Sequence, residues 1–371
     1  MKTHFYYDRS ILFTALALIG LGLVQVYSSS FIFAIEEYND GFHFVKRQFV
    51  FSLLGIAVLF IGPRIPWRFV EKYGFLIWVV ASVMVALTFI PGLGVKAGGA
   101  TRWLHIIPGL RVEPGELMKI GLVVLLAFFV AEKDKGLGEW KWAFRLLIVG
   151  APVTLLLFQP DFGTFALCLS LCFLIAFAFG LSWKHIIVSA MVLIPSVTAI
   201  MLAAPYRRKR LFAFMDPWSD PDNAGFQLIQ SMLSFHSGGL FGEGLGEGQG
   251  KLFFLPEAHT DFTLAVLGEE MGYIGFIILL TLYGIIIFRG FQISFSANQV
   301  FVKAFTLGLT LIFGLSVFTN IGVVLGLLPT KGLTLPFLSY GGSSLLTMCI
   351  LISLLLNAEA EYRKNLEYGN K

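Results

Sequence analysis

Charged side chains are scarce in this sequence. Its 27 basic and 23 acidic residues make up 13% of the 371 positions, against about 25% in a typical soluble domain. Hydrophobic residues account for 57% and the mean hydropathy is +0.80, so most side chains must face lipid or one another. This composition excludes a soluble enzyme, and it also excludes an intrinsically disordered chain.

Cysteine is equally scarce. Cys168, Cys172 and Cys349 all lie inside apolar runs, which leaves neither a disulfide framework nor a zinc cluster. The net charge of +4 is spread over the whole chain and forms no basic face, so we expect no nucleic acid among the partners. A polytopic, membrane-embedded protein is the class that remains.

Long apolar runs fill most of the chain. A hydrocarbon core about 30 Å thick needs about 20 apolar residues per helix, and segments of about that length alternate with charged or glycine- and proline-rich stretches. They cover 11–33, 48–63, 74–91, 116–131, 143–158, 164–180, 184–203, 263–288, 303–327 and 340–357. We therefore expect an all-α polytopic membrane protein of about ten transmembrane helices, with residues 1–371 forming a single integral membrane domain.

The placement of lysine and arginine sets the orientation. With the N-terminus in the cytoplasm, 15 of the 27 basic residues fall in the cytoplasmic loops and tails, as the positive-inside rule favours. The other 12 lie in the long loop or on or near the outer face, where headgroup anchoring explains some and a cavity for an anionic substrate would explain the rest. Both termini are then cytoplasmic, and 204–262 forms one long extracytoplasmic loop. Within it, 206–214 mixes basic and aromatic residues and 226–233 repeats apolar residues at helical spacing, which predicts two interfacial helices.

The glycine-rich stretch 238–251 follows those helices. It resembles a phosphate-binding loop only superficially, because no Gly-Lys-Ser/Thr opens a helix after a strand. We interpret it as a flexible substrate-gating loop, with a plain linker as the alternative.

Ionisable residues within the spans are few, and each is a functional candidate because burying one unpaired costs several kcal/mol. Glu116 and Lys119 open the fourth span at positions i and i+3, where they can pair. Asp161 stands in a tight turn between two spans, where capping the next helix is the favoured role. The segment 320–344 interrupts the last two spans with glycine, proline and hydroxyl residues, which is tolerated only where backbone is buried in protein or lines a cavity.

The densest polar cluster, 255–262, directly precedes the eighth span. Asp261 would lie at the outer mouth of that helix, with Glu269 and Glu270 deeper in. A carboxylate beside a low-dielectric wall has its pKa raised toward neutrality, which suits a general base. Helix capping with salt bridges is the alternative for Asp261, and for the neighbouring His259 packing is favoured over a metal site.

Six motifs, in order along the chain, identify the sequence as a member of the SEDS family (shape, elongation, division and sporulation), whose members polymerise peptidoglycan. They are GGATRW at 98–103, EPGELMK at 113–119, QPDFG at 159–163, YRRKR at 206–210, PEAHTDF at 256–262 and LPFLSYGGSS at 335–344. The stretches 257–259 and 329–336 resemble the cell-division (FtsW-type) branch more than the elongation (RodA-type) branch. Glu113 departs from the family's usual glutamine and adds a carboxylate beside Glu116.

The resemblance implies a peptidoglycan glycosyltransferase that polymerises lipid II into glycan strands at the outer face of the cytoplasmic membrane during cell division. The reaction would be an inverting sugar transfer with undecaprenyl pyrophosphate as leaving group; a lipid II flippase is the alternative. Asp261 would be the catalytic base, and Glu116 would orient Lys119. The residues expected to bind substrate are Arg102, Glu116, Lys119, Arg207, Arg210, Lys251 and Ser339.

Cofactors and partners follow from the same resemblance. The sequence holds no dedicated metal-ligand set, so no cofactor is certain; a divalent cation such as Mg or Mn would share the leaving-group role, because pyrophosphate attracts one. The implied partners are lipid II as substrate, a class B penicillin-binding protein (transpeptidase) and other division-machinery proteins. The expected location is the cytoplasmic (inner) membrane, multi-pass, at the division site.

Overall fold

The computed structural model describes residues 7–97, 100–107, 110–133, 140–180, 205–223, 225–251, 255–330 and 332–369, with isolated positions between 184 and 202. These residues are mostly helical. The helices are α1 (Arg9–Tyr38), α2 (His43–Ile61), α3 (Trp67–Leu87), α4 (Pro114–Lys133), α5 (Trp140–Phe158), α6 (Phe162–Ala178), α8 (Pro205–Met215), α9 (Phe226–Gly238), α10 (Thr263–Ser296), α11 (Val300–Val324) and α12 (Gly342–Gly369), with 3-10 turns η1 (Gly62–Arg64) and η2 (Pro217–Ser219).

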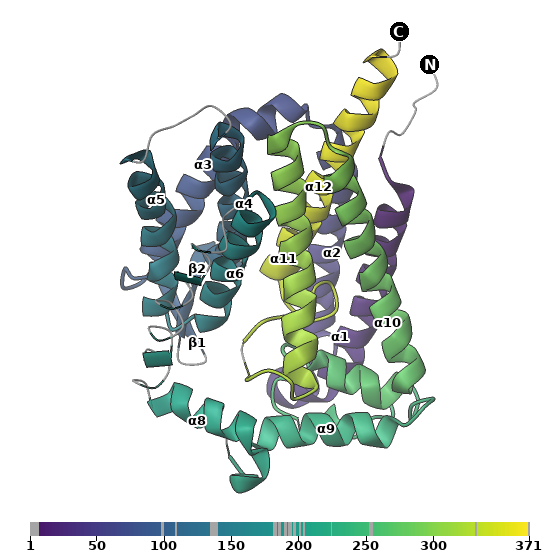
Figure 1. Ribbon diagram of the computed structural model, residues 1–371. Helices are drawn as coiled ribbons and strands as arrows, with labels where there is room; N and C mark the ends of the chain where they lie inside the picture. The colour runs from purple at the N-terminus through teal and green to yellow at the C-terminus, as the bar shows by residue number, and fades with distance from the viewer. Residues whose placement is uncertain are drawn as a thin grey trace.

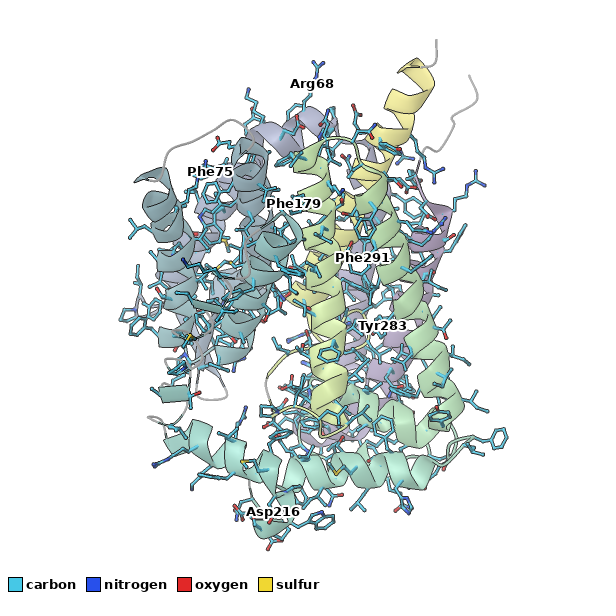
Figure 2. All side chains as sticks on the ribbon, in the orientation of Figure 1. Arg68, Phe75, Phe179, Asp216, Tyr283 and Phe291 are labelled. Carbon is cyan, nitrogen blue, oxygen red and sulfur yellow. The ribbon has the colours of Figure 1, made fainter. Side chains whose placement is uncertain are left out.

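The long helices stand side by side and the chain passes back and forth along them (Figure 1). Both termini lie at one end of the bundle, which we call the terminal end. Helices α8 and α9 lie across the opposite end, which we call the loop end (Figure 1). Arg68 projects at the terminal end and Asp216 at the loop end (Figure 2). The expectation that both tails share one side and that the long loop lies on the other is confirmed.

The expected all-α membrane architecture is also confirmed. Among the described residues, 7 helices are long and apolar enough to cross a membrane, and α6 and the Leu147–Phe158 part of α5 are shorter apolar helices. These nine correspond to nine of the expected spans. The remaining one, 184–203, lies largely outside the described residues.

Burial divides the helices into central and peripheral ones. In α4, α11 and α12, 67% of the most apolar window is buried, against 28% in α2 and α3. The central helices pack through small and branched side chains; Gly308 of α11, for example, lies against Val123 of α4 so closely that a Cβ would clash. The peripheral helices therefore present most of their apolar surface outward, as lipid-facing helices do.

Helix ends follow local capping chemistry. Asp8 precedes α1, and its carboxylate accepts a hydrogen bond of 2.7 Å from Ser10 N, which satisfies one of the free N–H groups of the first turn. Asn39 ends the same helix in the left-handed region at φ 53°, a common C-terminal stop. Asp161 caps α6 by accepting from Thr164 N at 3.2 Å, so the predicted capping role is confirmed.

Two features of the loop end bear on the sequence expectations. The predicted interfacial helices are present as α8 and α9. Between α3 and α4, however, the chain forms a three-stranded antiparallel sheet that was not expected, made of β1 (Gly94–Ala97), β2 (Ala100–Ile107) and β3 (Leu110–Val112) in that order. This sheet fixes the position of Arg102, which lies in the middle of β2.

The segment 325–341 connects α11 to α12 without regular structure, yet much of it is buried. Leu335, Phe337 and Leu338 are at most 2% exposed, and the Pro336 carbonyl accepts a hydrogen bond of 2.7 Å from the hydroxyl of buried Tyr283 (Figure 2). The predicted irregular, buried backbone is therefore confirmed for 325–341, whereas the ends of the expected range, 320–324 and 342–344, are helical.

Candidate active site

Asp261 lies in a tight turn just before α10. Thr260 N and Phe262 N both donate to the carbonyl of Glu257, at 3.1 and 3.2 Å, and Glu257 adopts φ 56°. The Asp261 carbonyl accepts from the side-chain amide of Asn320 on α11 at 3.0 Å, and the same amide donates to Leu333 O at 2.7 Å. Asn320 thus ties the turn to α11 and to the segment 325–341.

The carboxylate of Asp261 is half-buried and makes no hydrogen bond or ion pair with any residue in the described ranges. Burial raises its pKa to about 7, and the negative charge of Glu257 adds to the rise, while the positive charges of Arg102 and Arg210 oppose it. The expectation of a pKa near neutrality is confirmed. The capping alternative is wrong, because Phe262 is the N-cap of α10 and no side chain caps that helix.

Two arginines from distant elements reach the backbone beside Asp261. Arg102 of β2 donates from Nη1 to Gly332 O at 3.4 Å, and the same nitrogen lies 3.8 Å from Oδ1 of Asp161. Arg210 of α8 donates from Nη1 to Thr330 O at 3.4 Å. Because 330–332 adjoins Leu333, which Asn320 links to Asp261, the two guanidinium groups and the carboxylate share one region.

A second polar group lies at the start of α4. Lys119 Nζ and Glu116 Oε1 are 2.7 Å apart, and both side chains are almost fully buried, so the predicted pairing is confirmed. Glu116 Oε2 and Arg102 Nε are buried without a hydrogen-bond partner among the described residues. Buried polar atoms in that state are uncommon and call for an explanation, such as an absent ligand or water.

Glu113 joins this second group to the first. Its pKa is raised to about 8, mainly by burial and also by the carboxylates of Glu116 and Asp161, against the opposing positive charges of Arg102 and Lys119. Its backbone N–H donates to Ser343 Oγ, at the start of α12, at 3.1 Å. The extra carboxylate noted in the sequence therefore lies within the electrostatic reach of both cations.

Two of the remaining expected binding residues, Lys251 and Ser339, have partners within the protein. Lys251 is buried and its amine lies 2.6 Å from Glu270 Oε1, while the hydroxyl of buried Ser339 accepts from Leu335 N at 2.9 Å. These placements give no support to direct substrate binding by either residue. Arg207 belongs to α8, and its side chain lies outside the described residues.

His259 occupies an aromatic cluster. Its ring stacks on Phe33 with centroids 5.3 Å apart and also contacts Phe44 and Tyr340, and burial lowers its pKa. Among the described residues, no group of three His, Cys, Asp or Glu side chains could hold a metal ion. Packing accounts for His259, and the described residues do not fit a metal held by the protein alone.

The glycine-rich stretch is not a free loop over its described part, 238–251. Glu243 N and Gly244 N donate to carbonyls of α10 at 3.0 and 3.1 Å, and Gln249 N donates to the Glu269 carboxylate at 2.8 Å. The interpretation as a flexible gating loop is wrong, because the segment is bonded to α10 at both its start and its end.

Comparison with known proteins gives the family. The family model described as "Cell cycle protein", covering FtsW, RodA and SpoVE, matches residues 8–364. The chain belongs to this family. Relatives include the probable peptidoglycan glycosyltransferase FtsW of Geobacter metallireducens, 39% identical over 96% of each chain, and the stage V sporulation protein E of Bacillus subtilis, 35% identical over 94% of this chain and 96% of that one.

Solved structures agree with the fold of this family member. A chain of a structure described as "Structural coordination of polymerization and crosslinking by a peptidoglycan synthase complex" superposes with TM-score 0.77 at 28% identity, covering 96% of this chain and 98% of that one. The rod shape determining protein RodA of Thermus thermophilus gives TM-score 0.70 at 28% identity, covering 95% and 96%. The sequence-based identification of the family is confirmed.

Asn320 is a residue that the sequence analysis passed over. It stands as a lone amide in the apolar run 303–327, and the cost of burying an amide inside a span is the signal that could have marked it. Its role became apparent only because its two acceptors, Asp261 O and Leu333 O, are 59 and 13 residues away in sequence.

Proposed function

We propose that this protein is a peptidoglycan glycosyltransferase that polymerises lipid II into glycan strands during cell division. The observation that carries the proposal is Asp261, a half-buried carboxylate with a pKa of about 7 that has no hydrogen-bond or ion-pair partner in the described part of the chain. A base with this pKa is about half ionised at neutral pH and still basic enough to accept a proton. The names of the relatives point to the same chemistry.

In the proposed reaction, Asp261 takes the proton from the 4-hydroxyl of the acceptor N-acetylglucosamine. The hydroxyl oxygen attacks the anomeric carbon of the donor sugar and forms the new glycosidic bond with inversion. The bond from that carbon to the pyrophosphate oxygen breaks, and undecaprenyl pyrophosphate leaves with the bonding electrons. The proton ends on the Asp261 carboxyl.

The cations of the site would neutralise the leaving group. Arg102 and Arg210 present guanidinium groups, which suit bidentate contact with phosphate oxygens. The hydrogen bond of Arg102 is to a backbone carbonyl at 3.4 Å, longer than a strong charge-assisted bond, so an anionic ligand would compete well for this guanidinium group. Lys119, oriented by Glu116, supplies a further fixed positive charge behind Arg102.

The setting of the reaction belongs to the same proposal. The loop end faces outward from the cytoplasmic membrane at the division site, and a class B penicillin-binding protein cross-links the strands, with other division-machinery proteins as further partners. A divalent cation would arrive with the pyrophosphate, since the described residues hold no ligand set of their own. Chelation by EDTA during turnover tests that expectation.

The decisive test is a polymerisation assay. The full-length protein, purified with a class B penicillin-binding protein, should extend labelled lipid II into glycan strands, and Asp261→Ala should abolish the product. Asp40→Ala is the matched control, because Asp40 is an acid on the same side of the bundle that pairs with exposed Lys46. Lipid II translocation in proteoliposomes that survives Asp261→Ala, without polymerisation by the parent protein, would instead establish the flippase.

A further inference from the structure

Helix α10 is broken a short distance beyond Asp261. Gly272 has φ 63° and ψ −165°, which divides the helix into an outer segment, 263–271, and an inner segment, 273–296. The backbone groups freed by the break bond to the stretch 239–244. Those hydrogen bonds are Glu243 N to Glu269 O at 3.0 Å, Gly244 N to Glu270 O at 3.1 Å, Tyr273 N to Gly239 O at 2.9 Å and Ile274 N to Leu240 O at 3.2 Å.

The close contact between the stretch 239–244 and the break in α10 requires glycine at positions 242 and 272. A Cβ on Gly242 would lie 2.1 Å from Glu270 O, and one on Gly272 would lie 2.3 Å from Gly242 N. Gly272 also needs its positive φ, which other residues rarely adopt. The break at Gly272 is therefore a specific structural feature of the sequence. The outer segment, 263–271, is a separate short helix with its own hydrogen bonds to neighbouring segments.

Two buried acids attach the outer segment by their side chains. Glu269 accepts from Gln249 N at 2.8 Å and from Gly250 N at 3.1 Å. Glu270 pairs with Lys251 at 2.6 Å and accepts from the hydroxyl of Ser28 on α1. Lys251 also donates to Ser28 Oγ at 3.1 Å. Glu270 is 1% exposed, and Lys251 and Ser28 are each 8% exposed.

The ion pair closes a loop of chain that carries Asp261. Lys251 and Glu270 are 19 residues apart in sequence, and Asp261 lies midway between them. One arm of the loop runs from Lys251 to the turn at Glu257; the other is the outer segment, which begins two residues after Asp261. A shift of the outer segment relative to α1 must therefore move Asp261 relative to Arg102 and Arg210.

We propose that Lys251, Glu270 and Ser28 are positioning residues that hold Asp261 at its working distance from the two arginines. A buried ion pair is a poor source of stability, because desolvation offsets much of its attraction, but it specifies one geometry. The proposal rests on the proposed function for its catalytic consequence. It replaces the sequence-based expectation that Lys251 binds the substrate.

The experiment compares Lys251→Met, Glu270→Gln and the double variant, with Lys251→Arg as the conservative change. Arg289→Met is the matched control, because Arg289 and Asp8 form an ion pair of 2.7 Å between α10 and the start of α1 at the terminal end. Both single variants should lower kcat for lipid II polymerisation about tenfold, since displacing a catalytic group by about 1 Å costs that much or more, and KM should change by less than about twofold.

The double variant removes the unpaired buried charge that each single change leaves behind. The kcat of the double variant should therefore be no lower than that of either single variant, because the two residues act as one unit. Lys251→Arg should recover most of the rate and Arg289→Met should leave it unchanged. A raised KM with normal kcat in Lys251→Met, together with a normal Glu270→Gln, would overturn the proposal in favour of direct substrate binding. Equal losses of kcat in Arg289→Met would also overturn it.

A measurement that does not depend on catalysis tests the positioning role separately from the proposed enzymatic activity. Asp261→Cys places a thiol at the site; it is combined with Cys172→Ser, because Cys172 is only partly buried, while Cys168 and Cys349 are buried and react slowly. Lys251→Met and Glu270→Gln should each change the rate at which a charged methanethiosulfonate reagent labels Cys at position 261 by about threefold or more, since thiolate reactivity follows exposure and neighbouring charge. Arg289→Met should not change it. An unchanged labelling rate in both variants would refute the positioning role whether or not the parent protein polymerises lipid II.

Discussion

The arginines at the two ends of the bundle differ in how closely they approach carboxylates. At the terminal end, Arg289, Arg363 and Arg145 each lie within 2.7 Å of a carboxylate, on Asp8, Glu359 and Glu132 respectively. At the loop end, the nearest carboxylate to Arg102 is 3.8 Å away, and Arg210 reaches a backbone carbonyl at 3.4 Å. Asp261 and Arg102 therefore lie in one region without a tight ion pair. Other loop-end cations are paired as tightly as those of the terminal end: Lys119 with Glu116, Lys251 with Glu270 and Lys46 with Asp40, at 2.6 to 2.8 Å.

The difference separates structural charges from functional ones. Pairs at the terminal end have both partners within the protein and so can fix helices, although Asn357 Oδ1 at that end is also buried without a hydrogen-bond partner among the described residues. At the loop end, Arg102 Nε, Glu116 Oε2 and Asn320 Oδ1 are buried without partners in the described part of the chain, and each such atom costs free energy that a ligand could return. Buried atoms without partners also occur elsewhere in the described chain, at Gln25 and Asn357 for example, so it is their combination with the charges around Asp261 that distinguishes the site.

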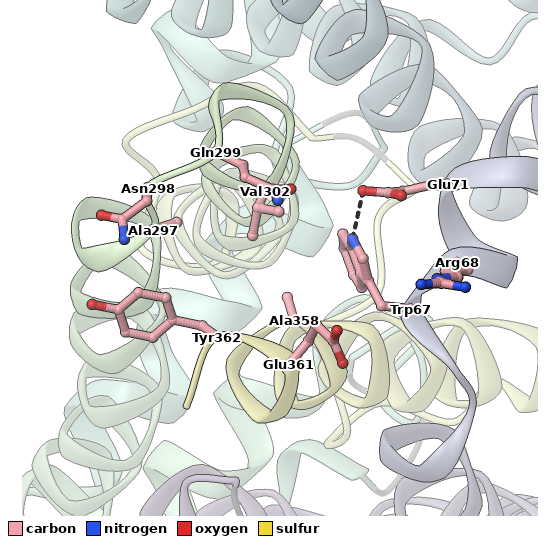
Figure 3. A pocket seen from close by; sticks show the side chains of 10 residues that line it. All are labelled: Trp67, Arg68, Glu71, Ala297, Asn298, Gln299, Val302, Ala358, Glu361 and Tyr362. Atoms are coloured by element: carbon pink, nitrogen blue, oxygen red, sulfur yellow. Dashed lines mark hydrogen bonds between the residues drawn. The ribbon is translucent and has the colours of Figure 1, made fainter. Parts of the chain in front are cut away.

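A cavity lined by described residues lies away from this site. A cavity of about 300 Å³ lies at the terminal end, where Trp67 donates from its indole nitrogen to Glu71 at 2.8 Å (Figure 3). Val302 and Ala358 also line it. It has no strained backbone or raised pKa comparable to the turn at Asp261, and it lies at the wrong end for chemistry on an exported sugar.

The largest expected effect comes from removing the base at the loop end. Asp261→Asn keeps the shape of the side chain and removes its basicity, so the rate of lipid II polymerisation should fall about 10³-fold, within the range that general-base catalysis contributes. The measurement is single-turnover glycan formation from labelled lipid II. Asp40→Asn, at an exposed paired acid, should retain full activity; a residual rate above about a tenth in Asp261→Asn would remove the base from this residue.

The second effect uses pH. Asp261 must be ionised to act, so kcat/KM should decline as pH falls through about 7, tenfold per pH unit below it. Arg102→Met removes a positive charge that lowers the pKa of Asp261, so the midpoint of that decline should move to higher pH, and the rate at the optimum should drop about tenfold with the loss of a phosphate-binding group.

Arg111→Met is the matched control for this shift. Arg111 is exposed on β3 and is not among the charges that act on Asp261, so its midpoint should stay at the parent value. If the pH midpoint of kcat/KM is the same in Arg102→Met as in the parent, a group other than Asp261 controls the loss of activity at low pH. The charges at the loop end would then not act on Asp261 as proposed.

Most of the fold, but only part of the site, could be predicted from the sequence. Apolar runs of membrane length mark the spans because each must satisfy its own backbone in lipid, and the spacing of Glu116 and Lys119 predicts their pair directly. The sheet around Arg102 escaped notice because strands of 3–8 residues in a connecting segment have weak periodicity.

Contacts between distant residues could not be predicted in this way. Nothing local distinguishes Lys251, which pairs with Glu270 and Ser28, from a substrate-binding lysine, because its partners are 19 and 223 residues away. Ser339 is similar: its hydroxyl is bonded by Leu335 N, which a motif match does not reveal. Residue type and spacing identified candidate groups, and tertiary packing gave Lys251 and Ser339 partners within the protein.

A smaller effect is expected at Glu113, the carboxylate that replaces the family's usual glutamine. Its pKa of about 8 keeps it mostly neutral at pH 7, so Glu113→Gln should change kcat/KM at pH 7 by less than about twofold. Above pH 8 the native carboxylate ionises beside Arg102 and Lys119 and repels an anionic ligand, so the parent should lose activity there while Glu113→Gln keeps it. Rate profiles from pH 6 to about 9.5 make the comparison; a tenfold loss at pH 7 would give Glu113 a role of its own.

The smallest effect on catalysis should come from the terminal end. Arg289 of α10 pairs with Asp8 at the start of α1, whereas Lys251 pairs with Glu270 of α10 and donates a hydrogen bond to Ser28 of α1; the Arg289 side chain is 37% exposed and that of Lys251 only 6%. Solvent screens the Arg289 pair, so Arg289→Met should lower the free energy of unfolding by about 1 kcal/mol or less and leave kcat unchanged. Thermal unfolding in detergent and polymerisation by the same preparation measure the two quantities. A loss of kcat without loss of stability would show that charges at the terminal end also reach the site, and the division between the two ends would fail.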